Sequence, residues 1–271
     1  MLDRAGVPSP DVDARILISD ALGCTPAELG LRANSEVSEE TASLVARRIA
    51  ARARREPLQH ILGRWPFLEL DLRSDHRALI PRPESEDVVL AARDLLDSHA
   101  QTRMIDVGTG GGALALAFAA SHPKCEILAL DIDGEALALA QENRREHGLE
   151  ERVQLVRSDL LTAVSAAEAF DLIIANLPYV SLEEYGVLEP EVRDFEPRQA
   201  LVAARGGLEV IFRLLEQAPA CLRPGGHLLL EMSPAQVDTV LQRANLPPWE
   251  NARVIVDRFG RRRAVHSQRK P

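Results

Sequence analysis

Apolar residues recur at helical spacing through the first part of the chain. Between residues 11 and 55 they return every three or four positions, with polar residues between them. These positions are Ala14, Leu17, Ile18, Ala21, Leu22, Leu44, Val45, Ile49 and Ala53. The spacing predicts amphipathic helices, and we expect a small helical domain over residues 1–56. Its last helix carries an arginine cluster that could meet an acidic partner but that we expect to be a solvated face: Arg47, Arg48, Arg52, Arg54 and Arg55.

A shorter, extended pattern follows over residues 57–83. Apolar and polar side chains alternate over residues 67–72, which is the period of a β-strand. Prolines punctuate the same segment at Pro66, Pro81 and Pro83. We therefore expect a β-hairpin that links the helical domain to the remainder of the chain.

Helical and extended patterns alternate over residues 84–271. Helices are predicted over residues 85–98, after Gly112, and over residues 134–147 and 208–222, the last closed by Pro224, Gly225 and Gly226. Strands are predicted over residues 104–107, 127–131, 153–156, 172–175, 227–232 and 253–256. This alternation predicts an α/β domain with a doubly wound, mostly parallel sheet and helices on both faces.

Composition and charge narrow the class of protein. The chain has 271 residues, of which 46% are hydrophobic and 27% charged, as in ordinary soluble proteins. The formal net charge of -9 argues against binding nucleic acid mainly through phosphate contacts. The three cysteines and seven histidines lack metal-ligand or disulfide spacing, so we expect no metal site. Neither a membrane span nor an apolar signal segment is evident, and we expect a cytoplasmic protein.

A glycine-rich turn stands where a strand should end and a helix begin. It consists of Gly108, Thr109, Gly110, Gly111 and Gly112. Glycines permit a tight turn and a close approach of the backbone to a ligand, although a purely structural turn would use them too. Asp131 follows at the end of the next strand, where a carboxylate can accept both hydroxyl hydrogens of a ribose. The pair predicts a site for a nucleotide-like cofactor.

The spacing within the turn bears on which cofactor binds. Glycines at alternate positions differ from the G-x-G-x-x-G of nicotinamide enzymes, and no lysine ends the loop as in nucleoside triphosphatases. Asp159 follows the third strand, where it suits an adenine amine with Leu160 against the ring, or simply caps the strand end. The geometry alone leaves a nicotinamide cofactor open, but the spacing disfavours it.

The strand over residues 170–176 ends in Asn176, Leu177, Pro178 and Tyr179. An amide or arylamine nitrogen is a poor nucleophile, and two acceptors, the Asn176 side-chain oxygen and the Leu177 carbonyl, can each take a hydrogen from its NH2 group. Pro178 fixes φ, and Tyr179 can lie over a planar acceptor. The turn predicts methyl transfer from S-adenosylmethionine to such a nitrogen, without a metal.

Nearly the whole chain resembles the release-factor glutamine N5-methyltransferases, which methylate the glutamine of the Gly-Gly-Gln loop of peptide chain release factors. The resemblance rests on residues 57–63, 79–86, 106–112, 195–201, 222–226 and 230–231, with Asp131 and the Asn176 turn. It implies a Rossmann-like methyltransferase domain that binds S-adenosylmethionine at residues 108–112, Asp131, Leu160 and Asn176. It also implies that the helical domain recognises a release factor. We expect a monomer without direct contact with nucleic acid or membrane.

The resemblance is incomplete at the acceptor turn. Leu177 stands where the family usually has proline, and the N-terminal helix is shorter. Asn-Leu-Pro-Tyr is similar to the turn of ribosomal-RNA adenine dimethyltransferases, so adenine N6 of RNA or DNA is an alternative acceptor. A cofactor-binding protein without turnover is another.

The roles of three further residues are left open by the sequence. Arg82 and Glu84 either border the cofactor or pair with each other, and Arg198 is a candidate for holding the substrate loop. The basic residues 261–263 are expected to be solvated.

Overall fold

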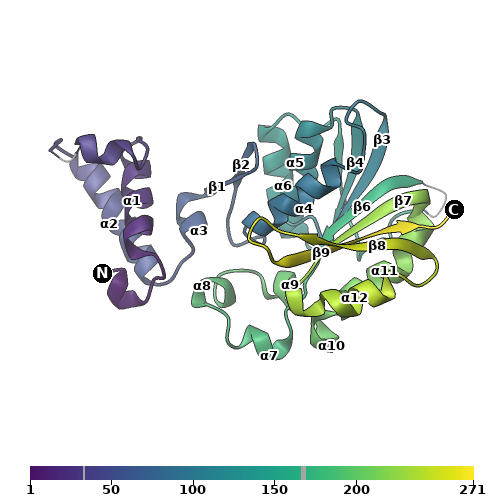
Figure 1. Ribbon diagram of the computed structural model, residues 1–271. Helices are drawn as coiled ribbons and strands as arrows, with labels where there is room; N and C mark the ends of the chain where they lie inside the picture. Colours follow the sequence, from purple (N-terminus) through teal and green to yellow (C-terminus); the bar gives the residue numbers. More distant parts are fainter. Residues whose placement is uncertain (33, 166–168) are drawn as a thin grey trace.

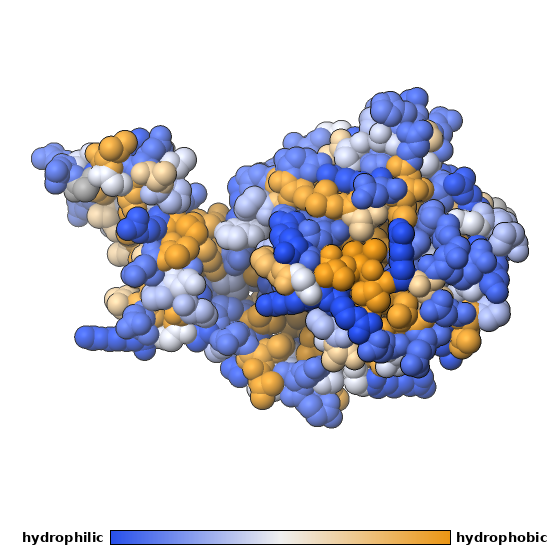
Figure 2. All heavy atoms as spheres, viewed as in Figure 1, coloured by the Kyte–Doolittle hydropathy of each residue, from blue (hydrophilic) through white to orange (hydrophobic). Residues whose placement is uncertain are grey.

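The computed structural model describes residues 1–32, 34–165 and 169–271. A group of N-terminal helices stands beside a larger part built around a β-sheet, and a small hairpin lies between them (Figure 1). The molecular outline narrows between the two parts (Figure 2). The N-terminal elements are η1 Asp3–Ala5, α1 Pro10–Ala21, η2 Glu28–Arg32, α2 Glu39–Ala53 and α3 Leu58–Leu62. The domain limits 1–56, 57–83 and 84–271 stay a prediction.

The arginines at the end of α2 are not a solvated face. Arg47 and Arg54 are exposed, but Arg52 is buried, and its guanidinium pairs with Asp13 of α1 at 2.7 Å. A second nitrogen of Arg52 pairs at 2.7 Å with Glu191, far away in the sequence. The expectation of a bland charged surface was wrong here, because these arginines join α2 to α1 and to the larger part of the molecule.

The predicted hairpin is present. Strands β1 (Arg64–Phe67) and β2 (Leu70–Arg73) pair in antiparallel register. Leu70 and Leu72 are buried while Asp71 and Arg73 are exposed, so the alternation in the sequence corresponds to an inner and an outer face.

The main sheet has seven strands in the order β5-β4-β3-β6-β7-β9-β8. Their bounds are β3 Thr102–Val107, β4 Cys125–Asp131, β5 Val153–Arg157, β6 Phe170–Asn176, β7 Leu222–Glu231, β8 Trp249–Val256 and β9 Arg262–Arg269. Strands β3 to β7 are parallel, whereas β9 runs antiparallel to both β7 and β8. The first six residues of β6 are buried, as expected for a central strand covered on both sides. The predicted mostly parallel α/β sheet is confirmed.

Helices cover both faces of the sheet. The longer ones are α4 Pro83–Arg93, α5 Ala113–Ser121, α6 Gly134–Glu146, α11 Glu209–Cys221 and α12 Val237–Arg243. Along β3, Met104 packs into the core formed with α4 and α5, and its neighbour Ile105 packs into the core formed with α11 and α12. Four short helices follow β6: α7 Leu182–Tyr185, α8 Pro190–Arg193, α9 Arg198–Leu201 and α10 Ala204–Gly207.

Two sequence predictions near the C-terminus were wrong. Pro224, Gly225 and Gly226 do not close α11, which ends at Cys221; they lie within β7, where the register with β6 shifts. Arg261 is exposed, but residues 261–263 are not a solvated tail as a whole, because Arg262 begins β9 and Arg263 is only 8% exposed. The pattern of β9 was missed because its buried positions include the polar His266 and Ser267.

Candidate active site

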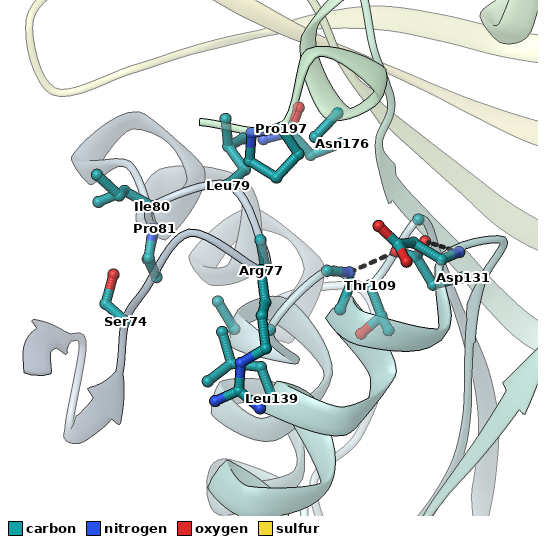
Figure 3. A pocket seen from close by; sticks show the side chains of 18 of the residues that line it. Ser74, Arg77, Leu79, Ile80, Pro81, Thr109, Asp131, Leu139, Asn176 and Pro197 are labelled. Carbon is teal, nitrogen blue, oxygen red and sulfur yellow. Dashed lines mark hydrogen bonds between the residues drawn. The ribbon is translucent and has the colours of Figure 1, made fainter. Parts of the chain in front are cut away.

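A cavity lies at the carboxyl ends of β3, β4 and β6, where ligands bind in open parallel sheets. The segment that carries Ser74, Leu79 and Pro81 forms one wall, and Thr109 and Asp131 stand on the opposite side (Figure 3). Asn176 lies at a further edge of the same cavity. The turn after β3 and the ends of two neighbouring strands therefore converge as predicted.

The glycine turn contributes most of one wall. Gly108, Thr109, Gly110 and Gly111 line the cavity, whereas Gly112 caps the N-terminus of α5. Gly108 has a φ of 73°, and a Cβ there would lie 3.0 Å from the Leu177 side chain. Only glycine allows the turn and the acceptor strand to approach this closely.

Asp131 presents a carboxylate to the cavity from the end of β4. Its Oδ2 accepts a hydrogen bond from the Gly110 N–H at 2.8 Å, and its Oδ1 accepts one from the Asp133 N–H at 2.9 Å. Burial raises its pKa, while these backbone donors lower it. Each oxygen retains a second lone pair, which leaves the carboxylate able to accept the two hydroxyl hydrogens of a ribose, and this assignment stays a prediction.

Asp106 is a site residue that sequence reasoning did not single out. Its Oδ2 accepts hydrogen bonds from the Thr109 hydroxyl at 2.7 Å and from the Ala115 N–H at 3.1 Å. The carboxyl is 1% exposed, and burial raises its pKa to about 7. Asp106 thereby ties the glycine turn to the first turn of α5. Its position two residues before the first glycine of the turn was the available signal.

Ile132 is a second missed residue. It lines the cavity next to Asp131, yet its side chain is 55% exposed. An exposed aliphatic side chain beside the Asp131 carboxylate offers an apolar surface to a flat ring.

Asp159 and Leu160 lie apart from the residues that line this cavity. The Asp159 carboxylate pairs with Arg213 at 2.7 Å, and both side chains are well exposed. Leu160 is buried and packs into the core beneath β3 and β6. Their assignment to the adenine stays a prediction.

The acceptor turn separates two cavities. Asn176 and Pro178 line the first cavity, while Leu177 and Tyr179, together with Asn176, line a second, more apolar one. The Leu177 side chain is 4% exposed and packs toward Gly108, so its backbone carbonyl is the group left to act. Burial raises the pKa of Tyr179 to about 12, which keeps its hydroxyl neutral. A turn in this place can present two hydrogen-bond acceptors and an aromatic wall between the cavities.

Gln236 and Gly207 contact the backbone of this turn at Tyr179. The Gln236 side-chain amide donates to the Tyr179 carbonyl at 2.8 Å and to the Gly206 carbonyl at 2.8 Å. Gly207 has a φ of 82°, and a Cβ on it would lie 1.8 Å from the Tyr179 carbonyl oxygen. The loop after α9 therefore needs glycine here to support the acceptor turn.

The open roles of Arg82, Glu84 and Arg198 are narrowed by their contacts. Arg82 borders both cavities and pairs at 2.5 Å with the buried Glu196. Glu84 is within ion-pair distance of Arg261 and Arg263, at 3.8 Å and 3.7 Å, so among the described residues its partners are these arginines and not Arg82. The Arg198 guanidinium lies over the Tyr185 ring and does not line either cavity.

Residues 1–32, 34–165 and 169–271 contain neither a metal-binding cluster nor a membrane-spanning helix. No group of three or more His, Cys, Asp or Glu side chains there could hold a metal ion. Nor does any helix in those ranges combine the length and the apolar character needed to cross a membrane.

Comparison with known proteins defines the class. The chain aligns with a methyltransferase from Pyrococcus furiosus with a TM-score of 0.57 and 20% sequence identity, over 87% of this chain and 100% of that one. Residues 89–189 match the methyltransferase small domain, and residues 1–63 match the PrmC N-terminal domain. The fold is that of the Rossmann-like methyltransferases.

Closer relatives define the family. The release factor glutamine methyltransferase of Deinococcus radiodurans is 41% identical over 99% of this chain and 94% of the relative. That of Rhodopirellula baltica is 35% identical over 98% and 92%, respectively. The chain belongs to the release factor glutamine methyltransferase family.

Proposed function

We propose that this protein methylates the side-chain amide nitrogen (N5) of the glutamine in the Gly-Gly-Gln motif of a peptide chain release factor, using S-adenosylmethionine. Family membership over nearly the full chain supports this activity. The single observation that carries it is the placement of Asn176, which borders both the cavity of the glycine turn and the adjoining apolar cavity. One cavity suits the cofactor, and the other suits the acceptor side chain.

The residues of the first cavity fit S-adenosylmethionine. Asp131 accepts the ribose hydroxyl hydrogens, and Ile132 offers an apolar face to the adenine ring. The glycine turn lets the backbone approach the methionyl part closely. When bound, the cofactor supplies an electrophilic methyl carbon.

The acceptor turn activates and orients the glutamine amide. The Asn176 Oδ1 and the Leu177 carbonyl would each accept one NH2 hydrogen, which raises electron density on the nitrogen and directs its lone pair toward the methyl carbon. The N–C bond forms as the C–S bond breaks, the neutral thioether is the leaving group, and the methylated nitrogen releases one proton to solvent. Tyr179, neutral because of its raised pKa, excludes water and does not act as a base. Holding both reactants in a near-attack pose contributes about 7–11 kcal/mol.

An adenine acceptor is the alternative, because the turn reads Asn-Leu-Pro-Tyr. The Leu177 side chain packs toward Gly108 and also lines the second cavity, so it does not by itself distinguish the two acceptors. The net charge of -9 disfavours a nucleic-acid substrate. We infer a release factor as partner, hence a cytoplasmic location, and retain a monomer as a prediction.

The test is methyl transfer from labelled S-adenosylmethionine to purified release factor, followed by mass spectrometry of the Gly-Gly-Gln peptide. We expect one methyl group on the glutamine, and none when that glutamine is replaced by alanine. Label on other residues, or on added RNA or DNA instead, would reject the proposed acceptor. Tight cofactor binding with no transfer to any of these would indicate a protein without turnover.

A further inference from the structure

A buried carboxyl group lies directly beside the acceptor turn and is not part of the mechanism above. Glu231, the last residue of β7, is the register partner of Asn176, the last residue of β6. It is 1% exposed, and its Oε2 has no hydrogen-bond partner among the described residues. Burial raises its pKa to about 7. A buried carboxyl group is costly, so its presence at this point calls for a role.

Ion pairing does not supply that role. Arg263 and Arg82 act on Glu231 through charge, and Glu84 opposes them. However, the guanidinium of Arg263 is within ion-pair distance of Glu84 and Asp257, at 3.7 Å and 3.4 Å, and Arg82 is paired with Glu196. Both arginines therefore already have carboxylate partners.

Ser85 connects Glu231 to the acceptor turn. This residue lies in the first turn of α4 and is 2% exposed. Its Oγ accepts a hydrogen bond from the Asn176 side-chain NH2 at 3.2 Å. Its hydroxyl also lies near Glu231 and lowers the pKa of that carboxyl against the larger effect of burial. The three side chains thus lie next to one another, from β7 through α4 to β6.

The direction of these hydrogen bonds follows from the groups themselves. In its ionised form, which prevails once the pH exceeds its raised pKa, the Glu231 carboxylate only accepts hydrogen bonds, so it draws the single proton of the Ser85 hydroxyl. The hydroxyl then has only lone pairs to offer Asn176, which must turn its NH2 toward Ser85. The Asn176 Oδ1 is left to face the acceptor. With the amide reversed, its NH2 would face the NH2 of the substrate, and two donors cannot bond to each other.

We propose that Glu231, acting through Ser85, is a positioning residue that fixes the Asn176 amide with its oxygen toward the nitrogen to be methylated. This inference rests on the proposed function. It assigns to Glu231 and Ser85 the selection of one amide orientation, which neither the glycine turn nor Asp131 can provide.

Kinetics with the full-length protein test the proposal. Replacing Glu231 by methionine keeps the length of the side chain and removes the acceptor, so we expect kcat for the release factor to fall about 10-fold, while KM and the cofactor Kd change less than about 2-fold. Glu231→Gln retains an acceptor oxygen and should recover part of kcat. The matched control is Glu126→Met, at an exposed position of β4, which should retain wild-type kcat.

A double-mutant cycle separates positioning from a general effect on folding. If Glu231 acts through Asn176, then Glu231→Met should cause no further loss in an Asn176→Ala background. An equal loss in both backgrounds, or an unchanged kcat in the single variant, would overturn the proposal. Should Glu231→Met fail to fold, Ser85→Ala replaces it in the same cycle, because it removes only one hydroxyl.

Hydrogen exchange of the Asn176 side-chain NH2, followed by NMR, does not depend on turnover. We expect slow exchange in the wild type and faster exchange in both Ser85→Ala and Glu231→Met. Equal exchange in all three proteins would contradict the proposed hydrogen-bond chain. Wild-type protein that leaves the release factor unmethylated would reject the proposed function instead, and the NMR result would still decide the amide orientation.

Discussion

The cofactor side and the outer, substrate side of the candidate site are held by different interactions. On the cofactor side, the carboxylates of Asp106 and Asp131 accept backbone N–H groups of the glycine turn and the first turn of α5. On the outer side, the segment after Tyr179 reaches the N-terminal helices through ion pairs between Arg52, Arg55 and Glu191. Strand ends and hydrogen bonds to the backbone hold the cofactor side, whereas ion pairs between side chains of distant elements position the outer side.

This difference suggests that the two halves respond separately to substitution. A change on the outer side should affect the release factor more than the cofactor, because the ion pairs do not touch the glycine turn. A change in the turn should do the reverse.

The largest effect is expected at Arg52. Replacing it by methionine leaves the buried Asp13 carboxylate without its cation and breaks one link to Glu191. Removing one partner of a buried ion pair costs about 3–5 kcal/mol. We expect denaturant unfolding to show that loss in the N-terminal part, and a higher KM for the release factor with an unchanged cofactor Kd.

The matched control is Arg48→Met, whose partner Asp20 is half exposed. This substitution should cost about 0–1 kcal/mol. Similar losses in both variants would contradict the comparison.

Asn176 is next. Asn176→Ala removes one of the two acceptors for the substrate NH2 group, and loss of one such group lowers kcat about 100- to 1,000-fold. Because Asn176 is at a strand end and not in the core, the unfolding midpoint and the cofactor Kd should change little. Single-turnover methylation of the release factor measures the effect. A rate equal to that of the wild type would refute the role of the side-chain oxygen.

The sequence predicted the part of the site that local patterns determine. Apolar periodicity located the strands, and because parallel strands end at one edge, Gly108, Asp131 and Asn176 could be expected to converge. No local pattern marks the pairing of Arg52 with Glu191, which are 139 residues apart, or that of Arg82 with Glu196. Such contacts depend on how separate elements pack, and a charge run looks the same whether it is solvated or paired.

Strand β9 was missed for a related physical reason. Residues 262–269 carry polar side chains at buried positions, where they find hydrogen-bond partners from neighbouring elements: the Ser267 hydroxyl donates to the Ala244 carbonyl at 2.8 Å. Hydrophobic periodicity cannot detect a position that is buried and polar. Ser85 and Glu231 are also buried and polar, so hydrophobic periodicity could not mark them either.

Asp131 should show the opposite selectivity to Arg52. Asp131→Ala removes a charge-assisted acceptor for a ribose hydroxyl, which weakens cofactor binding by about 1–3 kcal/mol. The KM for the release factor should stay close to that of the wild type. Calorimetric titration with S-adenosylmethionine measures the change, and Asp97→Ala, an exposed aspartate away from the cavity, is the control. An unchanged Kd would count against the ribose assignment.

The smallest predicted effect is a pH dependence of stability that comes from Glu231. Its folded pKa is raised from 4.5 to about 7, so the folded state holds a proton that the unfolded state releases between these values. Its contribution to stability is therefore present below about pH 4.5 and is lost as pH rises toward 7. Glu231→Gln cannot titrate, so its stability relative to the wild type should rise over that interval, by on the order of 1–3 kcal/mol. Urea unfolding of both proteins at pH 5 and pH 8 measures this difference. If the difference in unfolding free energy between the two proteins were the same at pH 5 and pH 8, the carboxyl of Glu231 would have an ordinary pKa. The strand ends beside the acceptor turn would then exclude water less completely than the surroundings of Asp106 do.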